Sequence, residues 1–139
     1  MRIVADANVL VSAALARSPQ SPSVLILEAV LDDRVELVVS PALLAELAEV
    51  LARPRIRRYV TADEAEEFVS YLSAHALFVA DALDPPQVCR DPDDDYLVAL
   101  ARVTNADSLV TGDDDLLAID PGRVVVNVVT PREFADRLG

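Results

Sequence analysis

Short apolar runs alternate with helix-like stretches along the whole chain. Five runs are continuously apolar, as expected for strands: residues 2–6, 35–40, 77–83, 108–113 and 123–129. Apolar periodicity predicts helices in the intervals: from about residue 8, then 21–33, 41–54, 61–76, 95–105, 114–119 and 131–138. Strands that are apolar throughout are typical of a parallel sheet covered on both faces. The pattern therefore predicts an α/β fold, a three-layer α/β/α sandwich around a central parallel sheet.

Two of the predicted helices begin with clear start signals. Ser40 followed by Pro41 is a cap with a proline at the first helical position. Thr61 with Glu64 three residues later forms a capping-box pattern. We find no internal repeat, low-complexity tract or linker that would divide the chain. The sequence therefore predicts a single domain over residues 1–139.

Length and composition indicate the size of the core and the cellular compartment of the protein. The chain has 139 residues and 53% of them are hydrophobic, enough for a sizeable core. No apolar run approaches the roughly 20 residues that cross a bilayer, and the N-terminus lacks the layout of a signal peptide. Cys89 is the only cysteine, which excludes an intramolecular disulfide. We therefore expect a reduced cytoplasmic protein that does not contact a membrane.

The charge is strongly negative and unevenly distributed. The formal net charge is −12, which weighs against a general nucleic-acid-binding surface because phosphate attraction needs cations. The positively charged residues are all arginine, and four of them gather at the end of predicted helix 41–54 and just after it: Arg53, Arg55, Arg57 and Arg58. This cluster is either a solvated helix end, where cations favour the dipole, or a local patch that contacts RNA phosphates.

Missing residue types exclude several kinds of site. Without lysine the chain has no P-loop, and it lacks the lysine that phosphatases and phospho-receiver domains normally need. Three glycines do not make a glycine-rich dinucleotide loop, and one histidine with one cysteine argues against zinc. Asp91, Asp93 and Asp95 suggest a calcium loop. That loop would need glycine and glutamate where Tyr96 and Arg102 stand.

Acidic residues stand where predicted strands end. Asp6 closes the first strand, and Asp113 follows the strand that begins at residue 108. A run of aspartates precedes the helix leading into that strand: Asp91, Asp93, Asp94 and Asp95. One capping aspartate would suffice at a helix start. Because ligands bind beyond the carboxyl ends of parallel strands, we expect some of these carboxylates to share one site.

Helical periodicity selects among the remaining acids. On helix 41–54, Glu46 lies at the margin of the apolar stripe, whereas Glu49 lies nearly opposite. The same count on helix 95–105 places Asp94 on the inward side and turns Asp95 away, although this helix is apolar nearly all round. Glu46 and Asp94 are therefore the acids that we expect to face the protein body.

Four acids from four segments are thus expected to converge at one end of the sheet: Asp6, Glu46, Asp94 and Asp113. Each alone fits an ordinary turn or surface residue. Together and uncompensated they would repel one another and take up protons. A hard divalent cation such as Mg²⁺ or Mn²⁺ accepts oxygen ligands and relieves that repulsion. The combination therefore predicts a metal site.

Four segments carry a family resemblance: "RIVADANVLVSAAL", "SPALLAELAEVLARP", "RDPDDDYLVALA" and "SLVTGDDDLL". In order and spacing they resemble the PIN domains, particularly the VapC-like toxins of bacterial toxin–antitoxin pairs. The resemblance spans essentially the whole chain. It implies an α/β/α sandwich and an Mg²⁺- or Mn²⁺-dependent ribonuclease site built from acidic residues.

The resemblance also assigns roles to positions in this sequence. The implied metal ligands and catalytic acids are Asp6, Glu46, Asp113 and one residue of the "DDD" run, with Asp115 as an additional ligand. Alignment leaves the third acid open between Asp94 and Asp95, and periodicity favours Asp94. Asn8 is the implied polar companion of the first acid, and Thr111 the supporting hydroxyl.

The activity that follows is metal-assisted hydrolysis of RNA phosphodiester bonds, with single-stranded RNA as the expected substrate. The resemblance further implies an antitoxin whose C-terminal segment covers the acidic cleft, and a homodimer. The alternative is a non-catalytic PIN-fold module that binds RNA or a protein partner. All four acidic positions are filled, which favours the enzyme.

Overall fold

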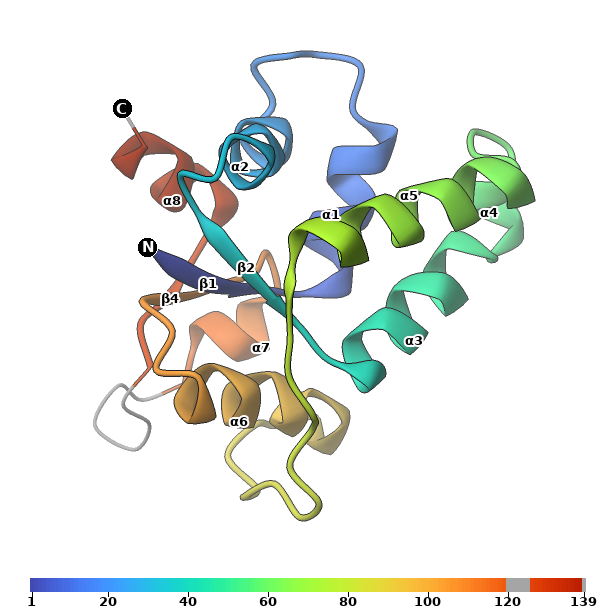
Figure 1. Cartoon of the computed structure of the whole chain (residues 1–139). Helices are drawn as coiled ribbons and strands as arrows, with labels where there is room; N and C mark the ends of the chain where they lie inside the picture. The colour runs from blue at the N-terminus through green and yellow to red at the C-terminus, as the bar shows by residue number, and fades with distance from the viewer. Residues whose placement is uncertain (120–125, 139) are drawn as a thin grey trace.

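Five parallel strands form the centre of the protein (Figure 1). The computed structural model describes residues 1–119 and 126–138. The strands are β1 (Arg2–Ala5), β2 (Glu36–Val39), β3 (Leu77–Phe78), β4 (Ser108–Val110) and β5 (Val128–Val129). They lie in the order β3-β2-β1-β4-β5, and each neighbouring pair is parallel. The predicted α/β class with a central parallel sheet is confirmed.

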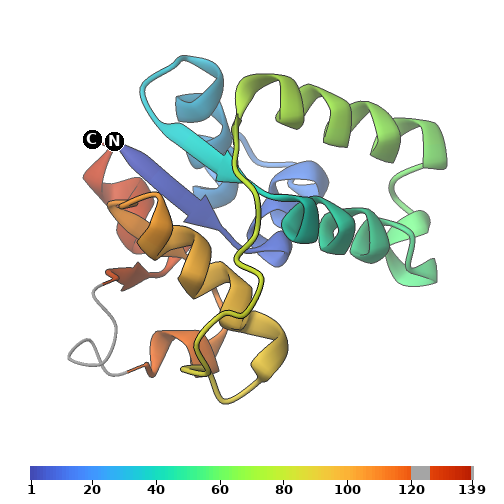
Figure 2. The ribbon, with the colours of Figure 1, turned by 60° about the horizontal axis from the view of Figure 1, so that its bottom comes forward.

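Helices cover both faces of this sheet. They are α1 (Ala7–Leu15), α2 (Pro22–Leu31), α3 (Pro41–Leu51), α4 (Pro54–Arg57), α5 (Ala62–His75), the short 3₁₀ helix η1 (Pro92–Asp94), α6 (Asp95–Val103), α7 (Asp114–Leu117) and α8 (Pro131–Arg137). Figures 1 and 2 show α6 on one side of the sheet and α1 and α2 on the other, which gives the three layers. In the described part of the chain, no helix combines the length and apolarity that spanning a membrane requires.

The middle strand β1 and its neighbour β2 lie at the centre of the core. Ile3 and Leu37 are register partners on β1 and β2, and both are buried. Leu97 and Val98 of α6 are each only 1% exposed. Burial from both sides explains why these strands are apolar at successive positions instead of alternating.

Two predicted elements differ from the observed ones. The predicted strand 77–83 pairs only at Leu77 and Phe78, which are exposed at the sheet edge. Helix 41–54 stops at Leu51, and Pro54 opens the separate short helix α4. Proline lacks an amide hydrogen and disfavours helical geometry in the residue before it, which separates the two helices. Of the predicted strand 123–129, residues 123–125 lie outside the described residues.

The predicted helix starts are confirmed. The Ser40 hydroxyl accepts the amide hydrogen of Leu43, with an N–O distance of 3.2 Å. Thr61 and Glu64 form the full capping box at the start of α5. These caps satisfy amide groups that have no partner inside the helix.

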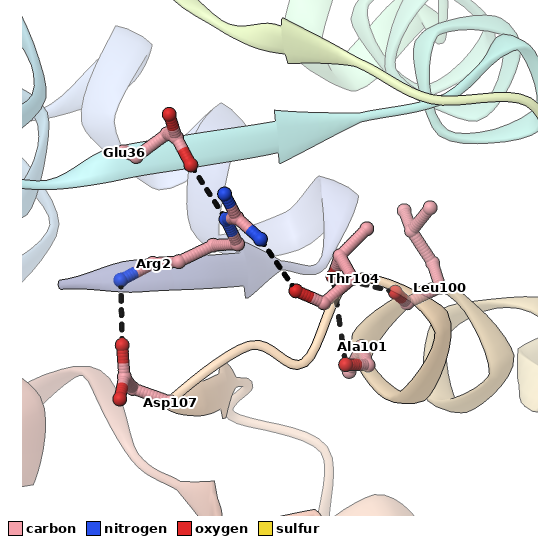
Figure 3. Close-up of polar contacts among 6 residues, drawn as sticks. All are labelled: Arg2, Glu36, Leu100, Ala101, Thr104 and Asp107. Atoms are coloured by element: carbon pink, nitrogen blue, oxygen red, sulfur yellow. Dashed lines mark hydrogen bonds and ion pairs between the residues drawn. The ribbon is translucent and has the colours of Figure 1, made fainter.

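A network around Arg2 ties the strands together at their amino-terminal ends (Figure 3). The Arg2 Nε atom lies 2.5 Å from an oxygen of Glu36, which joins β1 to β2. Arg2 Nη1 donates to the Thr104 carbonyl at 2.6 Å, and its backbone amide donates to Asp107 at 2.7 Å. The network therefore anchors the segment between α6 and β4, at the end of the sheet opposite to the strand carboxyl ends.

Candidate active site

Asp6 lies directly beyond the carboxyl end of β1 and is only 5% exposed. It is the N-cap of α1: its Oδ1 accepts the amide hydrogen of Val9 at 2.9 Å. Its Oδ2 accepts a hydrogen bond from the Thr111 hydroxyl. Its backbone amide donates to the Val110 carbonyl of β4 at 3.1 Å. The carboxylate is therefore held by the first turn of α1 and by the residue that follows β4.

Thr111 connects the segments of two acids. It follows β4 and is fully buried. Its hydroxyl donates to Asp6 and accepts the amide hydrogen of Asp113 at 3.0 Å. Asp113 in turn caps α7, where its Oδ1 accepts the amide hydrogen of Asp115 at 2.8 Å. The structure thus places Thr111 where its hydroxyl orients Asp6 and fixes the turn that carries Asp113.

Glu46 approaches from α3, and a tyrosine holds it. Glu46 is half-buried, whereas Glu49 is exposed and lies 3.9 Å from Arg53, as helical periodicity predicted. The Tyr96 hydroxyl of α6 donates to Glu46 Oε2. Sequence reasoning missed Tyr96, because one more large side chain in an apolar helix looks like core. Its position directly after the aspartate run was the available signal.

Mutual repulsion shows that the four acids share one region. Burial raises the pKa of Asp94 to about 6, and the charges of Asp91, Asp113, Glu46 and Asp6 add to the effect. Burial likewise raises the pKa of Asp6, against the opposing effect of its two hydrogen bonds, and the charges of Glu46 and Asp113 raise it further. A charge shifts the pKa of another group only when the two lie near each other, so these carboxylates occupy one region of the protein. We call Asp6, Glu46, Asp94 and Asp113 the acidic group.

Asp95 corrects one expectation. Periodicity turned this residue outward, but it is buried, with 3% of its surface exposed. Its Oδ1 accepts the amide hydrogens of Val88 at 3.0 Å and Cys89 at 2.8 Å. Burial opposes ionisation, yet these hydrogen bonds outweigh it and lower the pKa of Asp95. The segment before α6 folds back over the helix start, a contact that periodicity within the helix does not reveal. The Asp95 carboxylate therefore anchors the segment before α6 by hydrogen bonds and does not face the acidic group.

The other predicted site residues, outside the acidic group, are Asn8, Asp115 and the arginine cluster. A hollow of about 310 Å³ opens beside Asp6 and Asp113, two members of the acidic group, and Asn8 also lines it. Asp115 is half-exposed and lies 3.5 Å from Arg90 Nη1. Three members of the arginine cluster are exposed and Arg57 is half-buried: Arg53 follows α3, and the other three stand in and just after α4. No ion pair joins this cluster to the acidic group among the described residues.

The carboxylate oxygens of the acidic group are the type of ligand that a hard divalent cation prefers. The described residues nevertheless contain no preformed ligand cluster. In residues 1–119 and 126–138, no three histidine, cysteine, aspartate or glutamate side chains approach closely enough to hold a metal ion. Mg²⁺ typically keeps several waters and takes only one or two carboxylates directly. Burial and, to a smaller extent, the neighbouring negative charges raise the pKa values of Asp6 and Asp94, and a bound cation would offset both effects.

Comparison with known proteins identifies the family. A family model described as PIN domain matches residues 2–115. The chain belongs to the PIN domain family. The match runs from β1 into α7 and so contains every member of the acidic group. PIN domains are generally nucleases and typically use divalent metal ions, although some are non-catalytic.

Several known proteins are similar to this PIN domain in sequence or in fold. The protein MJ1680 of Methanocaldococcus jannaschii is 26% identical over 98% of this chain and 90% of its own length. The structure of PAE2754 from Pyrobaculum aerophilum has a TM-score of 0.66 and 16% identity, over 99% of this chain and 89% of that one. VapBC2 from Rickettsia felis, solved with a promoter DNA fragment, has a TM-score of 0.61 and 14% identity over 94% and 98%. The likeness to these solved structures supports the fold.

Replacing Thr111 with valine should weaken both stability and the site. The variant keeps the shape but leaves the Asp113 amide without its acceptor and Asp6 Oδ2 without its donor. We expect a loss of about 1–3 kcal/mol in the free energy of unfolding. We also expect the pKa of Asp6 to rise further, because the Thr111 hydrogen bond opposes its increase. Urea unfolding and an NMR titration of the Asp6 carboxyl would measure the two effects.

Thr104→Val is the matched control for this prediction. Thr104 is also buried, but its hydroxyl donates to the Leu100 carbonyl within its own helix. That carbonyl also accepts the Thr104 amide hydrogen, so it keeps a partner in the variant. We expect a smaller loss of stability and no change at Asp6. Equal effects of the two substitutions would contradict a special role for Thr111.

Proposed function

We propose that this PIN domain is a metal-dependent endoribonuclease that hydrolyses RNA phosphodiester bonds with Mg²⁺ or Mn²⁺. The observation that carries the proposal is the acidic group: four carboxylates from four segments gather near the carboxyl end of a parallel sheet, where burial and the neighbouring charges raise the pKa of Asp6 and of Asp94. Helix capping accounts for Asp6 and Asp113, but it does not account for Glu46 and Asp94 beside them. Ligands of α/β sheets bind at this end.

The acidic group is proposed to hold the metal and the scissile phosphate. Asp6, Glu46, Asp94 and Asp113 are the proposed ligands, and Asp94 is preferred over Asp95 because hydrogen bonds to Val88 and Cys89 occupy the latter. When bound, a divalent cation acidifies a water molecule and stabilises charge on the leaving oxygen.

The chain's own side chains orient these acids. The Thr111 hydroxyl fixes Asp6, and the Tyr96 hydroxyl fixes Glu46. Partners of this kind hold a ligand's geometry, and their loss typically costs about 10- to 100-fold in metal affinity or activity. Asn8 lines the hollow beside Asp6, where a polar side chain can contact the substrate. Asp115 is a secondary candidate ligand, because Arg90 already lies 3.5 Å from its carboxylate.

We further propose that the protein is the toxin of a toxin–antitoxin pair. The sequence motifs resemble VapC-like toxins, and VapBC2 shares the fold. An antitoxin segment would cover the acidic cleft and block access to RNA. We expect the protein to act in the cytoplasm as a single domain, and the family resemblance suggests a homodimer.

Incubation of the purified protein with a mixed cellular RNA pool tests the enzyme directly. We expect cleavage with Mn²⁺ or Mg²⁺, and an initial rate at least about 100-fold lower with EDTA, because the metal supplies several kcal/mol of transition-state stabilisation. Mapping the cut ends would show whether single-stranded segments are preferred. RNA binding without cleavage, by protein shown to bind the metal, would favour the non-catalytic module.

A further inference from the structure

A second hollow, of about 380 Å³, adjoins the acidic one. It lies between α1, the end of α3, and α4, and we call it the α1–α4 groove. Its floor is apolar, with Val11 and Val50 among the lining residues, while Arg55 and Tyr59 contribute polar groups. Asn8 and Ser12 line this groove and also the hollow at the acidic group. The two hollows therefore share a wall, and one extended ligand could occupy both.

The aromatic and cationic side chains in and beside this groove are exposed to solvent. Tyr59 is 63% exposed. Arg55 and Arg58 are exposed, and no ion pair holds either of them among the described residues. The nearby Arg53 does pair, with Glu49 at 3.9 Å. In a chain of net charge −12, free guanidinium groups beside a carboxylate cluster provide a local attraction for anions.

We propose that the α1–α4 groove is a nucleotide subsite for single-stranded RNA. A base of the strand stacks on Tyr59 over the apolar floor, and the Arg55 guanidinium contacts its phosphate. A neighbouring phosphate then lies at the acidic group, beyond Asn8 and Ser12. The inference extends the proposed function, because it names the substrate contact beside the cleavage site.

Charge and shape favour a nucleotide over other occupants. Without its metal the acidic group repels a phosphate backbone, so an acidic nuclease needs a cationic contact elsewhere to hold RNA. Stacking on an aromatic ring beside a guanidinium is the usual way in which proteins hold unpaired bases without sequence preference. An amphipathic peptide would use the apolar floor but would gain little from Arg55 unless it were acidic.

Anisotropy of a short, labelled, mixed-sequence single-stranded RNA tests the subsite in EDTA, where cleavage plays no part. Tyr59→Ala should weaken binding about tenfold, because one stacked base typically contributes that much. Tyr59→Phe keeps the ring and should retain wild-type affinity. Arg55→Gln should reduce the slope of log affinity against log salt by about 0.7, the value for one phosphate contact to a single strand.

Tyr71→Ala and Arg102→Gln are the matched controls. Tyr71 is 54% exposed on α5, and Arg102 is exposed on α6 away from the groove. Both variants should bind RNA as the wild type does. Equal losses in test and control variants, or no binding by the wild type, would overturn the subsite. So would a Tyr59→Ala variant that binds RNA normally but loses an amphipathic helical peptide, since the groove would then serve a protein partner.

This test separates the subsite from the enzyme proposal. RNA that binds through Tyr59 and Arg55 but is never cut with Mn²⁺ would support the subsite and refute the nuclease. Metal-dependent cleavage that neither substitution affects would support the nuclease and refute the subsite.

Discussion

Asp6→Asn should eliminate RNA cleavage and leave the fold intact. Asparagine preserves the side-chain shape and can still accept the amide hydrogen of Val9, so α1 keeps its cap. It lacks the negative charge that binds a divalent cation. We expect the initial rate with Mn²⁺ to fall at least about 100-fold, equivalent to a loss of about 2.7 kcal/mol in transition-state stabilisation. Calorimetric titration with Mn²⁺ should show a parallel loss of affinity.

Asp136→Asn is the control for this experiment. Asp136 is exposed on α8, so the substitution changes the net charge equally without touching the acidic group. We expect wild-type cleavage from this variant. Circular dichroism and urea unfolding should show that both variants are folded. An Asp6→Asn protein that cleaves as fast as the control would refute the assignment of Asp6 as a metal ligand.

Asp94→Asn should have opposite effects on activity and stability. As a proposed ligand, Asp94 is needed for cleavage, and its loss should lower the rate at least about tenfold. Its pKa is raised from 3.8 to about 6 by burial and by neighbouring carboxylates, so the folded state without metal binds its proton more tightly than the unfolded state. We therefore expect the variant without metal to be more stable than the wild type at neutral pH.

The stability difference between Asp94→Asn and the wild type should depend on pH. Well below pH 3.8 the Asp94 carboxyl is protonated in both states and costs nothing. As pH rises from about 4 through about 6, the unfolded chain ionises first, and the wild type loses stability that the Asn variant keeps. Because Asp94 is partly exposed, solvent screening limits this gain to about 1 kcal/mol or less. Urea unfolding in EDTA at pH 4 and pH 7.5 would measure it.

The neighbouring Asp95→Asn is a sharp contrast. The pKa of Asp95 is lowered by the two amide hydrogen bonds that outweigh its burial, so its charge stabilises the fold. This variant should lose stability at pH 7.5, whereas Asp94→Asn should gain it. If both variants lost stability there, the Asp94 pKa would not be raised by burial and neighbouring carboxylates.

Local signals in the sequence were sufficient for most of the fold. Buried strands carry continuous apolar runs, and helix starts carry Ser, Thr and Pro at defined positions, because both patterns arise from neighbours along the chain. Glu46 was separable from Glu49 for the same reason, since periodicity alone decides which one faces inward. The edge strand β3 was predicted too long because its pairing depends on β2, not on its own sequence.

Contacts across the chain were beyond sequence reasoning. Asp95 is buried because residues 88 and 89 fold over it, and no periodicity within α6 predicts that. Tyr96 reaches Glu46 across 50 sequence positions. A single tyrosine in an apolar helix does not by itself predict a hydrogen bond to a glutamate on another helix. The candidate acids could be named from the sequence, but the side chains that orient them required the structure.

The double duty of Asp6 and Asp113 has an evolutionary consequence. Both carboxylates cap helices, so selection for a stable fold retains them even in a descendant that has lost its chemistry. Glu46 lies in the middle of α3, and Asp94 makes no capping hydrogen bond with its side chain. Neither carboxylate caps a helix, so selection for stability retains these two positions less strongly, even with the hydrogen bond from Tyr96 to Glu46. A decaying lineage should therefore lose Glu46 and Asp94 first, which makes them the residues that distinguish working enzymes from silent relatives.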